Sequence, residues 1–237
     1  MSKFAVILAA AGRSERFGAA HTKKVFTLLA NRPMWMYSAE AFSKRDDVGQ
    51  IILVIAQEDR EVFSEKYAAN AAMLGIQVVI GGAERADSVL NALKQVRGDL
   101  EYVAVHDAAR PCIADPWIDA VFKEAKRSGA AILASQVHAT VKRVGQDNQI
   151  VETVPRSGLW LAQTPQVFRT DLLKQAYAKH PAPSSATDEA SIVEQFGHAV
   201  KVVPCSMMNI KVTTKEDMKL AENALKSLPK ANPFPFG

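Results

Sequence analysis

The sequence predicts an α/β protein with a doubly wound, mostly parallel β-sheet. Short apolar runs alternate along the chain with segments of helical periodicity, and this alternation is typical of right-handed strand–helix–strand crossovers. The runs are apolar almost throughout, as expected for strands that are buried on both faces of a sheet. The expected strands are residues 4–9, 51–56, 76–80, 102–106 and 130–137.

The segments between these strands carry helix signals. Pro33 can stand at the start of a helix, and residues 58–72 form a second helical segment. Residues 85–96 place their apolar side chains on one helical stripe. Asp115 is expected to be the N-cap of the next helix, with Pro116 at its first position. Further helices are expected at residues 170–179, 188–196 and 214–227, and further strands near 199–204 and 209–213.

The alternation of strands and helices is interrupted after residue 137. Residues 140–154, TVKRVGQDNQIVETV, predict two strands around a turn at Gly145-Gln146-Asp147-Asn148. Because an isolated two-stranded hairpin is only marginally stable, we expect it to pack on another surface, such as a second subunit.

We expect residues 1–228 to form one domain, since no internal repeat and no linker divides the chain. The hairpin would be an arm over about residues 138–156. Residues 229–237 hold three prolines and are expected to be a frayed tail.

Composition narrows the class of protein. Of the 237 residues, 48% are hydrophobic and 23% are charged, as in ordinary soluble globular proteins. The formal net charge of +4 permits anionic substrates without demanding a nucleic acid. Cys112 and Cys205 lie far apart in the sequence, so we expect two buried thiols in a reducing compartment rather than a disulfide or zinc site.

The first residues could be read as a short signal peptide. Only one cation, Lys3, precedes the apolar run, and that run is as short as such signals allow, so a buried strand is the better interpretation. No apolar run approaches the ~20 residues of a membrane span. We therefore expect a cytoplasmic protein with neither a membrane nor a nucleic acid as partner.

The loop after the first strand has the residue types of a polyphosphate site. Small residues let a ligand approach the backbone N–H groups, and the cations that follow can neutralise it. The loop is neither a P-loop nor a GxGxxG motif, and a solvated basic loop with an ordinary glycine turn is the alternative. The candidate residues are Ala10, Ala11, Gly12, Arg16 and one of Lys23 and Lys24.

Two further strand ends carry candidate site residues, because ligands of doubly wound sheets lie beyond the carboxyl ends of the strands. Gly81 and Gly82 allow close approach of the backbone, and Ser88 in the next helix could bind a base or sugar; a capped helix is the alternative. Asp107 ends its strand and could hold Mg²⁺ or have a structural role. His106 is expected to be a packed residue of that strand.

Three more cations follow in the chain. Arg110 lies just after Asp107. Arg156 and Lys211 lie beside compact turns, and either of these two could bind a second, smaller phosphate or face solvent. No GxSxG motif or obvious histidine triad points to a hydrolase.

Seven sequence blocks together resemble the 2-C-methyl-D-erythritol 4-phosphate cytidylyltransferase family of the non-mevalonate isoprenoid pathway, over about residues 4–225. They occur in family order: AAG with Arg16 and a following lysine, GGAERADSV, VHDAARPC, TVPRSGLW, QTPQVF, TDEAS and NIKVT. The resemblance implies a Rossmann-like fold of the nucleotide-diphospho-sugar transferase type. It also implies in-line attack of the substrate phosphate on the α-phosphorus of CTP, with release of pyrophosphate and no covalent enzyme intermediate.

The resemblance also implies roles for the candidate residues. Arg16 and Lys24 would stabilise charge on the α-phosphate, and Asp107 would hold Mg²⁺ or another divalent cation. The arm would cross to a partner in a homodimer, so that Thr140 and Arg156 would serve the other subunit's site. The nucleotide would be bound by Ala10, Ala11, Gly12, Gly82 and Ser88. The sugar phosphate would be bound by Thr140, Arg156, Thr187 and Lys211, with Arg156 and Lys211 also catalytic, and Arg110 is expected to be a further substrate-binding residue.

The sequence departs from the family pattern in the first loop. Ser14 replaces the second glycine, Phe17 a methionine and Lys23 a proline. Alignment by the KVF block selects Lys24 as the catalytic lysine, whereas distance from Arg16 would select Lys23.

A further departure is Met208, which stands where the family usually has an aspartate before NIKVT. The alternatives to the main interpretation are the sibling ribitol-5-phosphate cytidylyltransferase, a more distant sugar-nucleotide pyrophosphorylase and a non-catalytic nucleotide-binding homologue. ERADSV, DAAR and TDEAS argue against the sibling, which tends to differ in these blocks.

Overall fold

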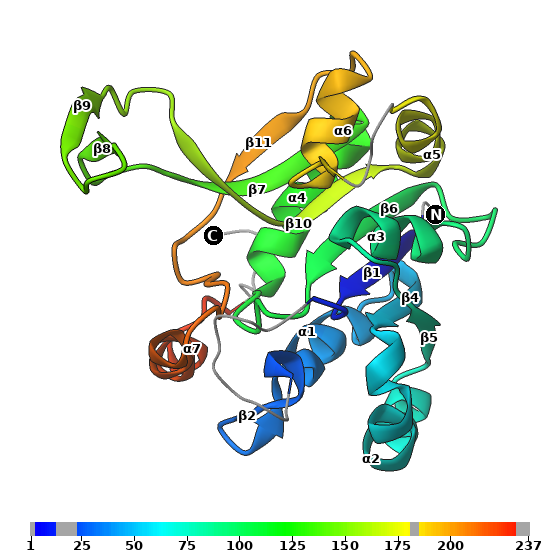
Figure 1. The fold of residues 1–237 in the computed structure, drawn as a ribbon. Coiled ribbons are helices and arrows are strands. Elements are labelled where there is room, and N and C mark those ends of the chain that lie inside the picture. Colours follow the sequence, from blue (N-terminus) through cyan, green and yellow to red (C-terminus); the bar gives the residue numbers. More distant parts are fainter. Residues whose placement is uncertain (1–2, 13–22, 181–184, 231–237) are drawn as a thin grey trace.

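A seven-stranded sheet with helices on both faces forms the body of the protein (Figure 1). The computed structural model describes residues 3–12, 23–180 and 185–230. The strand order is β11-β7-β10-β6-β1-β4-β5. The strands are β1 (Phe4–Ala9), β4 (Val48–Ile55), β5 (Ile76–Ile80), β6 (Tyr102–Asp107), β7 (Ala130–Gln136), β10 (Trp160–Arg169) and β11 (Lys201–Pro204).

The seven α-helices among the described residues lie close to the predicted ranges. They are α1 (Met34–Ser43), α2 (Arg60–Met73), α3 (Arg85–Leu93), α4 (Asp115–Ser128), α5 (Thr170–Lys179), α6 (Glu189–Gln195) and α7 (Lys215–Lys226). Short 3₁₀ turns, η2 (Lys24–Phe26) and η3 (Gln57–Asp59), and a small ladder of β2 (Leu28–Leu29) with β3 (Arg32–Pro33) complete the body.

Helices cover the sheet on both faces, which confirms the doubly wound prediction. Phe4, Val6 and Leu8 of β1 pack in one core cluster with buried residues of α1, α2, α4 and α7. Ala5 and Ile7 pack in a second cluster with α3, α5 and α6. Alternate side chains of one strand thus enter different cores, as the two-residue period of a strand requires.

The direction in which strands are added to the sheet reverses at β1. From β1 the chain proceeds outward through β4 to β5 and then returns to form β6 on the other side of β1, and all these pairs are parallel. Ligands of open α/β sheets bind beyond the carboxyl ends of the strands at such a reversal.

One central strand, β10, was not predicted. It runs antiparallel between β6 and β7. Its middle holds Gln163, Thr164, Pro165 and Gln166, which interrupt the apolar pattern, and its pairing with β7 shifts register between Ala162 and Gln166. The polar residues are nevertheless buried, because they face polar partners rather than an apolar core.

Two local predictions were wrong. Residues 209–213 form no strand; they pass over the loop after β6, where Val212 donates its backbone N–H to the carbonyl of Ala109 at 2.8 Å. Asp115 is the first residue of α4 rather than its N-cap, which is Ala114. Pro33 is the N-cap of α1, so its placement at a helix start is confirmed.

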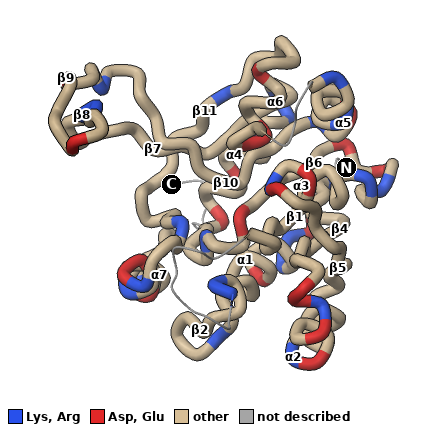
Figure 2. Tube along the Cα trace, viewed as in Figure 1, with Lys and Arg blue, Asp and Glu red and all other residues tan. Residues whose placement is uncertain are grey.

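The predicted hairpin is present as an arm that projects from the sheet (Figure 1). Its strands are β8 (Val141–Val144) and β9 (Ile150–Val154), paired antiparallel. Figure 2 shows charged residues on the arm and on outer helices such as α2 and α7, whereas β1 and β7 carry none. None of the helices in the described ranges is long and apolar enough to cross a membrane.

His106 is a packed residue, as predicted, and it links the end of β6 to β10. Thr164 Oγ1 accepts the Asp107 N–H at 3.0 Å and lies 3.1 Å from His106 Nδ1, while His106 Nε2 lies 3.1 Å from the Arg110 carbonyl. Because a carbonyl only accepts, Nε2 donates to it and Nδ1 accepts the Thr164 hydroxyl proton. The neutral ring therefore holds both ends of the turn at residues 107–110.

This burial predicts a pH dependence of stability. Burial lowers the pKa of His106 from 6.5 to about 4, so between these values the unfolded chain binds a proton that the folded chain refuses. Stability from this group is complete above pH 6.5 and is lost as the pH falls toward 4. We expect His106→Asn to reduce the slope of unfolding free energy against pH by about 1.4 kcal/mol per unit in that window.

Urea unfolding at several pH values measures this slope. The wild-type protein, unfolded at the same pH values, is the reference. An unaltered slope in His106→Asn would contradict the assignment of a buried neutral imidazole.

Candidate active site

The loops after β1 and β6 leave the sheet side by side. Ala9 pairs with Asp107 across the two strands, and Ala108 donates its N–H to the Ala9 carbonyl at 3.1 Å. Ala10 donates to Val54 of β4 at 2.9 Å. The predicted nucleotide-binding residues 10–12 therefore begin beside the predicted metal-binding Asp107.

The loop after β5 closes against the same place. A Cβ on Gly81 would lie 2.8 Å from Ala11 Cβ, and one on Gly82 would lie 2.5 Å from Asp87 Cβ, so neither position has room for a side chain. Ser88 holds the turn: its hydroxyl accepts the Gly82 N–H at 3.1 Å and donates to the Glu84 carbonyl at 3.0 Å. The loop after β5 therefore places backbone without side chains beside the end of β1. At Gly12, by contrast, an added Cβ would meet no other atom of the described residues.

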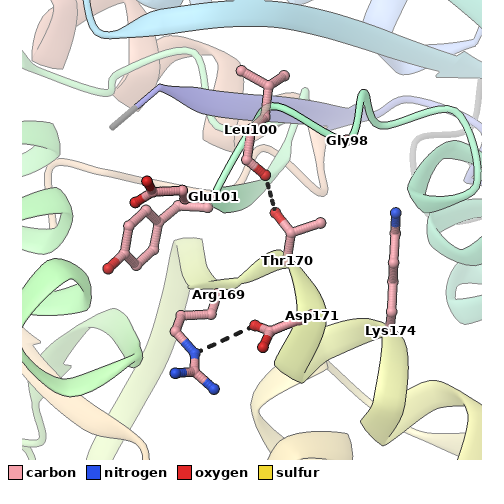
Figure 3. Close-up of a pocket in the computed structure, with 8 residues that line it drawn as sticks. Gly98, Leu100, Glu101, Arg169, Thr170, Asp171 and Lys174 are labelled. Atoms are coloured by element: carbon pink, nitrogen blue, oxygen red, sulfur yellow. Dashed lines mark hydrogen bonds and ion pairs between the residues drawn. The ribbon is translucent and has the colours of Figure 1, made fainter. Parts of the chain in front are cut away.

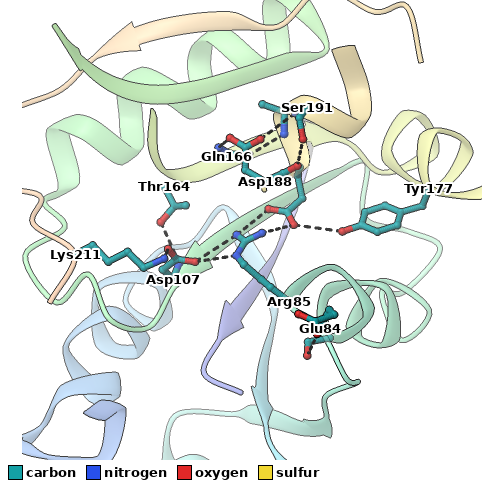
Figure 4. Close-up of polar contacts among 12 residues, drawn as sticks. Glu84, Arg85, Asp107, Thr164, Gln166, Tyr177, Asp188, Ser191 and Lys211 are labelled. Atoms are coloured by element: carbon teal, nitrogen blue, oxygen red, sulfur yellow. Dashed lines mark hydrogen bonds and ion pairs between the residues drawn. The ribbon is translucent and has the colours of Figure 1, made fainter. Parts of the chain in front are cut away.

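A polar hollow of about 240 Å³ opens beside these loops. It gathers four of the predicted residues, Asp107, Arg110, Thr187 and Lys211. The sequence analysis had not selected its other polar side chains, which are Arg85, Gln163, Thr164, Gln166 and Asp188. They come from the first residue of α3, from β10 and from the N-cap of α6. Figure 4 shows Arg85, Thr164 and Asp188 among them.

Asp107 is the electrostatic centre of the hollow. Its side chain is almost buried, with Lys211 Nζ 2.7 Å from Oδ2 and Arg85 Nη2 3.3 Å from Oδ1. Burial alone would raise the pKa of the Asp107 carboxyl, but the charges of Arg85 and Lys211 outweigh it and hold that pKa well below its usual range. Asp107 is therefore ionised at neutral pH.

Arg85 is bound in turn by a buried carboxylate. Its guanidinium donates to both oxygens of Glu189, at 2.7 and 2.9 Å, and Tyr177 donates its hydroxyl to Glu189 at 3.3 Å (Figure 4). Glu189 has no exposed surface. Burial alone would lower the pKa of Arg85, yet Glu189 and Asp107 together raise it. Sequence blocks GGAERADSV and TDEAS contained Arg85 and Glu189, but no pattern showed that they pair.

Lys211 reaches Asp107 because Asn209 anchors its segment. The buried Asn209 amide donates at 2.9 Å to the Gln163 side chain and at 2.9 Å to the Thr164 carbonyl. Arg110 Nη1 donates to the Asn209 carbonyl at 2.7 Å. The polar residues that made β10 hard to predict are therefore those that position Lys211.

The other predicted residues of the described ranges do not line this hollow. Thr140 and Arg156 are exposed at the base of the arm, where Arg156 donates to the carbonyl of His138. Arg16 lies outside the described residues. Lys23 contacts Glu58 at 2.7 Å and Asp59 at 2.9 Å, whereas Lys24 begins η2.

The acidic residues suit a metal ion only in company with a phosphate ligand. Over the described ranges, no three His, Cys, Asp or Glu side chains are grouped as a metal site. Mg²⁺ is commonly held by one or two carboxylates plus substrate phosphates, and Asp107 fits that part. The Asp107 oxygens already contact Arg85 and Lys211, so a bound metal ion would share the carboxylate with these two cations.

A larger hollow, of about 420 Å³, lies away from the predicted residues. It is lined by Leu100, Glu101 and Tyr102 where β6 begins and by Arg169, Thr170 and Lys174 around the start of α5 (Figure 3). Arg169 there pairs with Asp171 at 3.3 Å. This hollow lies at the amino end of β6, whereas ligands of such sheets bind at the carboxyl ends of the strands. We therefore do not assign it as the active site, although it is larger than the first hollow.

The arrangement suits binding of a polyanion more than covalent chemistry. Arg85, Arg110 and Lys211 line the same hollow as Asp107, beside a loop whose Gly81 and Gly82 leave no room for a side chain. Burial raises the pKa of Cys205 to about 11 and that of Cys112 to about 12, so both free thiols stay protonated and unreactive.

The chain is similar to known proteins of a single family. Residues 4–227 match the sequence pattern of the family described as 2-C-methyl-D-erythritol 4-phosphate cytidylyltransferase. The protein of that name from Rhodopirellula baltica is 40% identical over 231 residues, which cover 93% of each chain. The one from Bacillus mycoides is 41% identical over 223 residues, covering 94% of this chain and 97% of the relative.

Solved structures of the same name share the fold. The structure from Francisella tularensis superposes with a TM-score of 0.79 at 34% identity, over 94% of this chain and all of that one. The structure from Thermus thermophilus gives 0.78 at 29% identity, over 95% of this chain and all of that one. The Rossmann-like fold is thereby confirmed, and the chain belongs to the 2-C-methyl-D-erythritol 4-phosphate cytidylyltransferase family.

Proposed function

We propose that the protein joins CTP and 2-C-methyl-D-erythritol 4-phosphate to give 4-diphosphocytidyl-2-C-methyl-D-erythritol and pyrophosphate, a step of non-mevalonate isoprenoid biosynthesis. The observation that carries the proposal is the hollow at the carboxyl edge of the sheet, where Arg85, Arg110 and Lys211 surround Asp107. Membership of the family supplies the substrate class that this charge pattern fits.

In the proposed reaction, a phosphate oxygen of the acceptor attacks the α-phosphorus of CTP. The bond from that phosphorus to the bridging oxygen breaks, and pyrophosphate leaves with the electron pair. Such a displacement needs alignment and charge stabilisation rather than a protein nucleophile.

The chain's own groups would supply both. Ala10, Ala11, Gly12, Gly82 and Ser88 would form the nucleotide-binding loops, and Arg16 and Lys24 would face the α-phosphate. Arg110, Thr187 and Lys211 would hold the acceptor phosphate. A divalent cation, when bound with the triphosphate, would neutralise phosphate charge, and Asp107 would hold it.

The protein is further proposed to act as a homodimer through its arm. Val144, Ile150 and Val151 on the arm are 50%, 62% and 65% exposed, and Trp160 and Leu161 at its base are 39% and 47% exposed. Exposed apolar side chains gathered on one element in this way favour an interface. In a dimer, Thr140 and Arg156 would complete the partner's site, which accounts for their distance from the hollow.

We also propose that the protein is located in the cytoplasm. Cys112 and Cys205 are both free thiols, as is usual in reducing compartments. Cell fractionation with an antibody to the protein tests this, and recovery in an extracytoplasmic fraction would contradict it.

The proposed activity is tested by pyrophosphate release from CTP and Mg²⁺. Release is expected with 2-C-methyl-D-erythritol 4-phosphate as acceptor and not with ribitol 5-phosphate. Release only with ribitol 5-phosphate would move the protein to the sibling activity. CTP binding without release on either acceptor would indicate a non-catalytic homologue.

Lys24 is expected to matter far more than Lys23. Lys24→Ala should lower kcat/KM by about 10²-fold or more, because it removes the positive charge that would stabilise the transferring phosphate. Lys23→Ala should stay within a few-fold of wild type, since its ammonium is already paired with Glu58 and Asp59. Steady-state kinetics of both variants measure this, and the reverse ranking would assign the role to Lys23.

The crossing of the arm is tested by mixing two inactive variants, Arg156→Ala and Lys211→Ala. If the arm serves the partner, half of the randomly mixed dimers are mixed and one of their two sites is intact, giving about a quarter of wild-type activity. If the arm served its own subunit, every site would lack one group and mixing would restore nothing.

A further inference from the structure

Asp107 has two cationic partners that are held in different ways. Arg85 is fixed at the start of α3 by two hydrogen bonds to the fully buried Glu189, at 2.7 and 2.9 Å. Lys211 extends from an irregular segment, its side chain is 41% exposed, and it touches Asp107 through one ammonium contact of 2.7 Å. Figure 4 shows the two cations approaching Asp107 from separate elements.

The difference determines which cation can move. Arg85 cannot turn away without leaving Glu189 as a buried carboxylate with no cation, which is costly. A lysine ammonium is a point charge on a flexible stem, so Lys211 can rotate to another anion nearby. Lys211 is therefore the mobile partner and Arg85 the fixed one.

Departure of Lys211 would leave Asp107 dependent on Arg85. The Asp107 side chain is only 9% exposed, and a carboxylate so poorly hydrated needs a cation or hydrogen-bond donors. Arg85 Nε and Nη2 both lie 3.3 Å from Asp107 Oδ1, close enough to supply them.

We infer that Arg85, held by Glu189 and Tyr177, is a positioning residue that retains Asp107 so that Lys211 can transfer from Asp107 to a substrate phosphate. Without Arg85, Asp107 would hold Lys211 as its main counter-ion, and the transfer would be harder. The inference rests on the proposed function, because a phosphate substrate must draw Lys211 away.

The test is a double-mutant cycle between the Arg85 pair and Lys211. Arg85→Met combined with Glu189→Gln removes both charges of the pair, so no buried carboxylate is stranded and the fold is spared. We expect kcat/KM for 2-C-methyl-D-erythritol 4-phosphate to fall about 10-fold or more, while the CTP dissociation constant changes less than about threefold. In a Lys211→Met background the same changes should cause no further loss.

The matched control is Arg45→Met. Arg45 is 14% exposed and binds both oxygens of Asp47, at 2.9 and 3.0 Å, just before β4 and far from the hollow. The Arg45→Met substitution should lower the melting temperature of the protein without changing its kcat/KM. The inference would be overturned if the variant that combines Arg85→Met with Glu189→Gln lost stability without losing kcat/KM, as the control should. It would also be overturned if this variant and Lys211→Met lowered kcat/KM independently, so that their combined loss was the product of the two.

A binding readout separates this result from the proposed function. Wild-type turnover reports on the function alone. Calorimetric titration of the same four proteins with 2-C-methyl-D-erythritol 4-phosphate in the absence of CTP reports on Lys211 without turnover, and weaker binding in the pair variant only when Lys211 is present would support the inference. Equal affinity in all four proteins, or no binding to any, would overturn it.

Discussion

The nearly buried carboxylate of Asp107 is the constraint on which the site depends. An ionised group with so little contact with water must be neutralised by nearby cations, and these come from α3 and from the segment before α7. Arg85 in turn requires Glu189 at the start of α6. One charge thus ties together β6 and three elements that are distant in the sequence.

This requirement explains the unusual strand in the middle of the sheet. β10 brings buried polar side chains to the middle of the sheet, where they face polar partners. Thr164 holds the backbone of Asp107 through a hydrogen bond of 3.0 Å, and Asn209 is fixed by Gln163 and by the Thr164 carbonyl. The fold therefore gives up apolar burial at one strand to assemble cations around the ligand edge, as an anion-binding site requires.

Much of the fold could be predicted because its parallel strands are buried on both faces, which makes the apolar runs easy to see. β10 was missed because the polar residues at its centre belong to the site and interrupt the apolar pattern. Residues 209–213 were wrongly predicted as a strand, because their backbone forms its hydrogen bond with the loop after β6 rather than with the sheet. Asp107, Arg110, Thr187 and Lys211 could be proposed from motifs and do share one hollow. Arg85 and Glu189 could not be paired, because 104 positions separate them and their bond depends on the folded packing of α3 against α6.

The most direct measurement is a crystal structure with 4-diphosphocytidyl-2-C-methyl-D-erythritol bound. Our account predicts that Lys211 contacts a phosphate of the ligand and no longer contacts Asp107, while Arg85 still bridges Asp107 and Glu189. A structure in which Lys211 remains on Asp107, or in which Arg85 leaves Glu189 to bind the phosphate, would contradict the central claim.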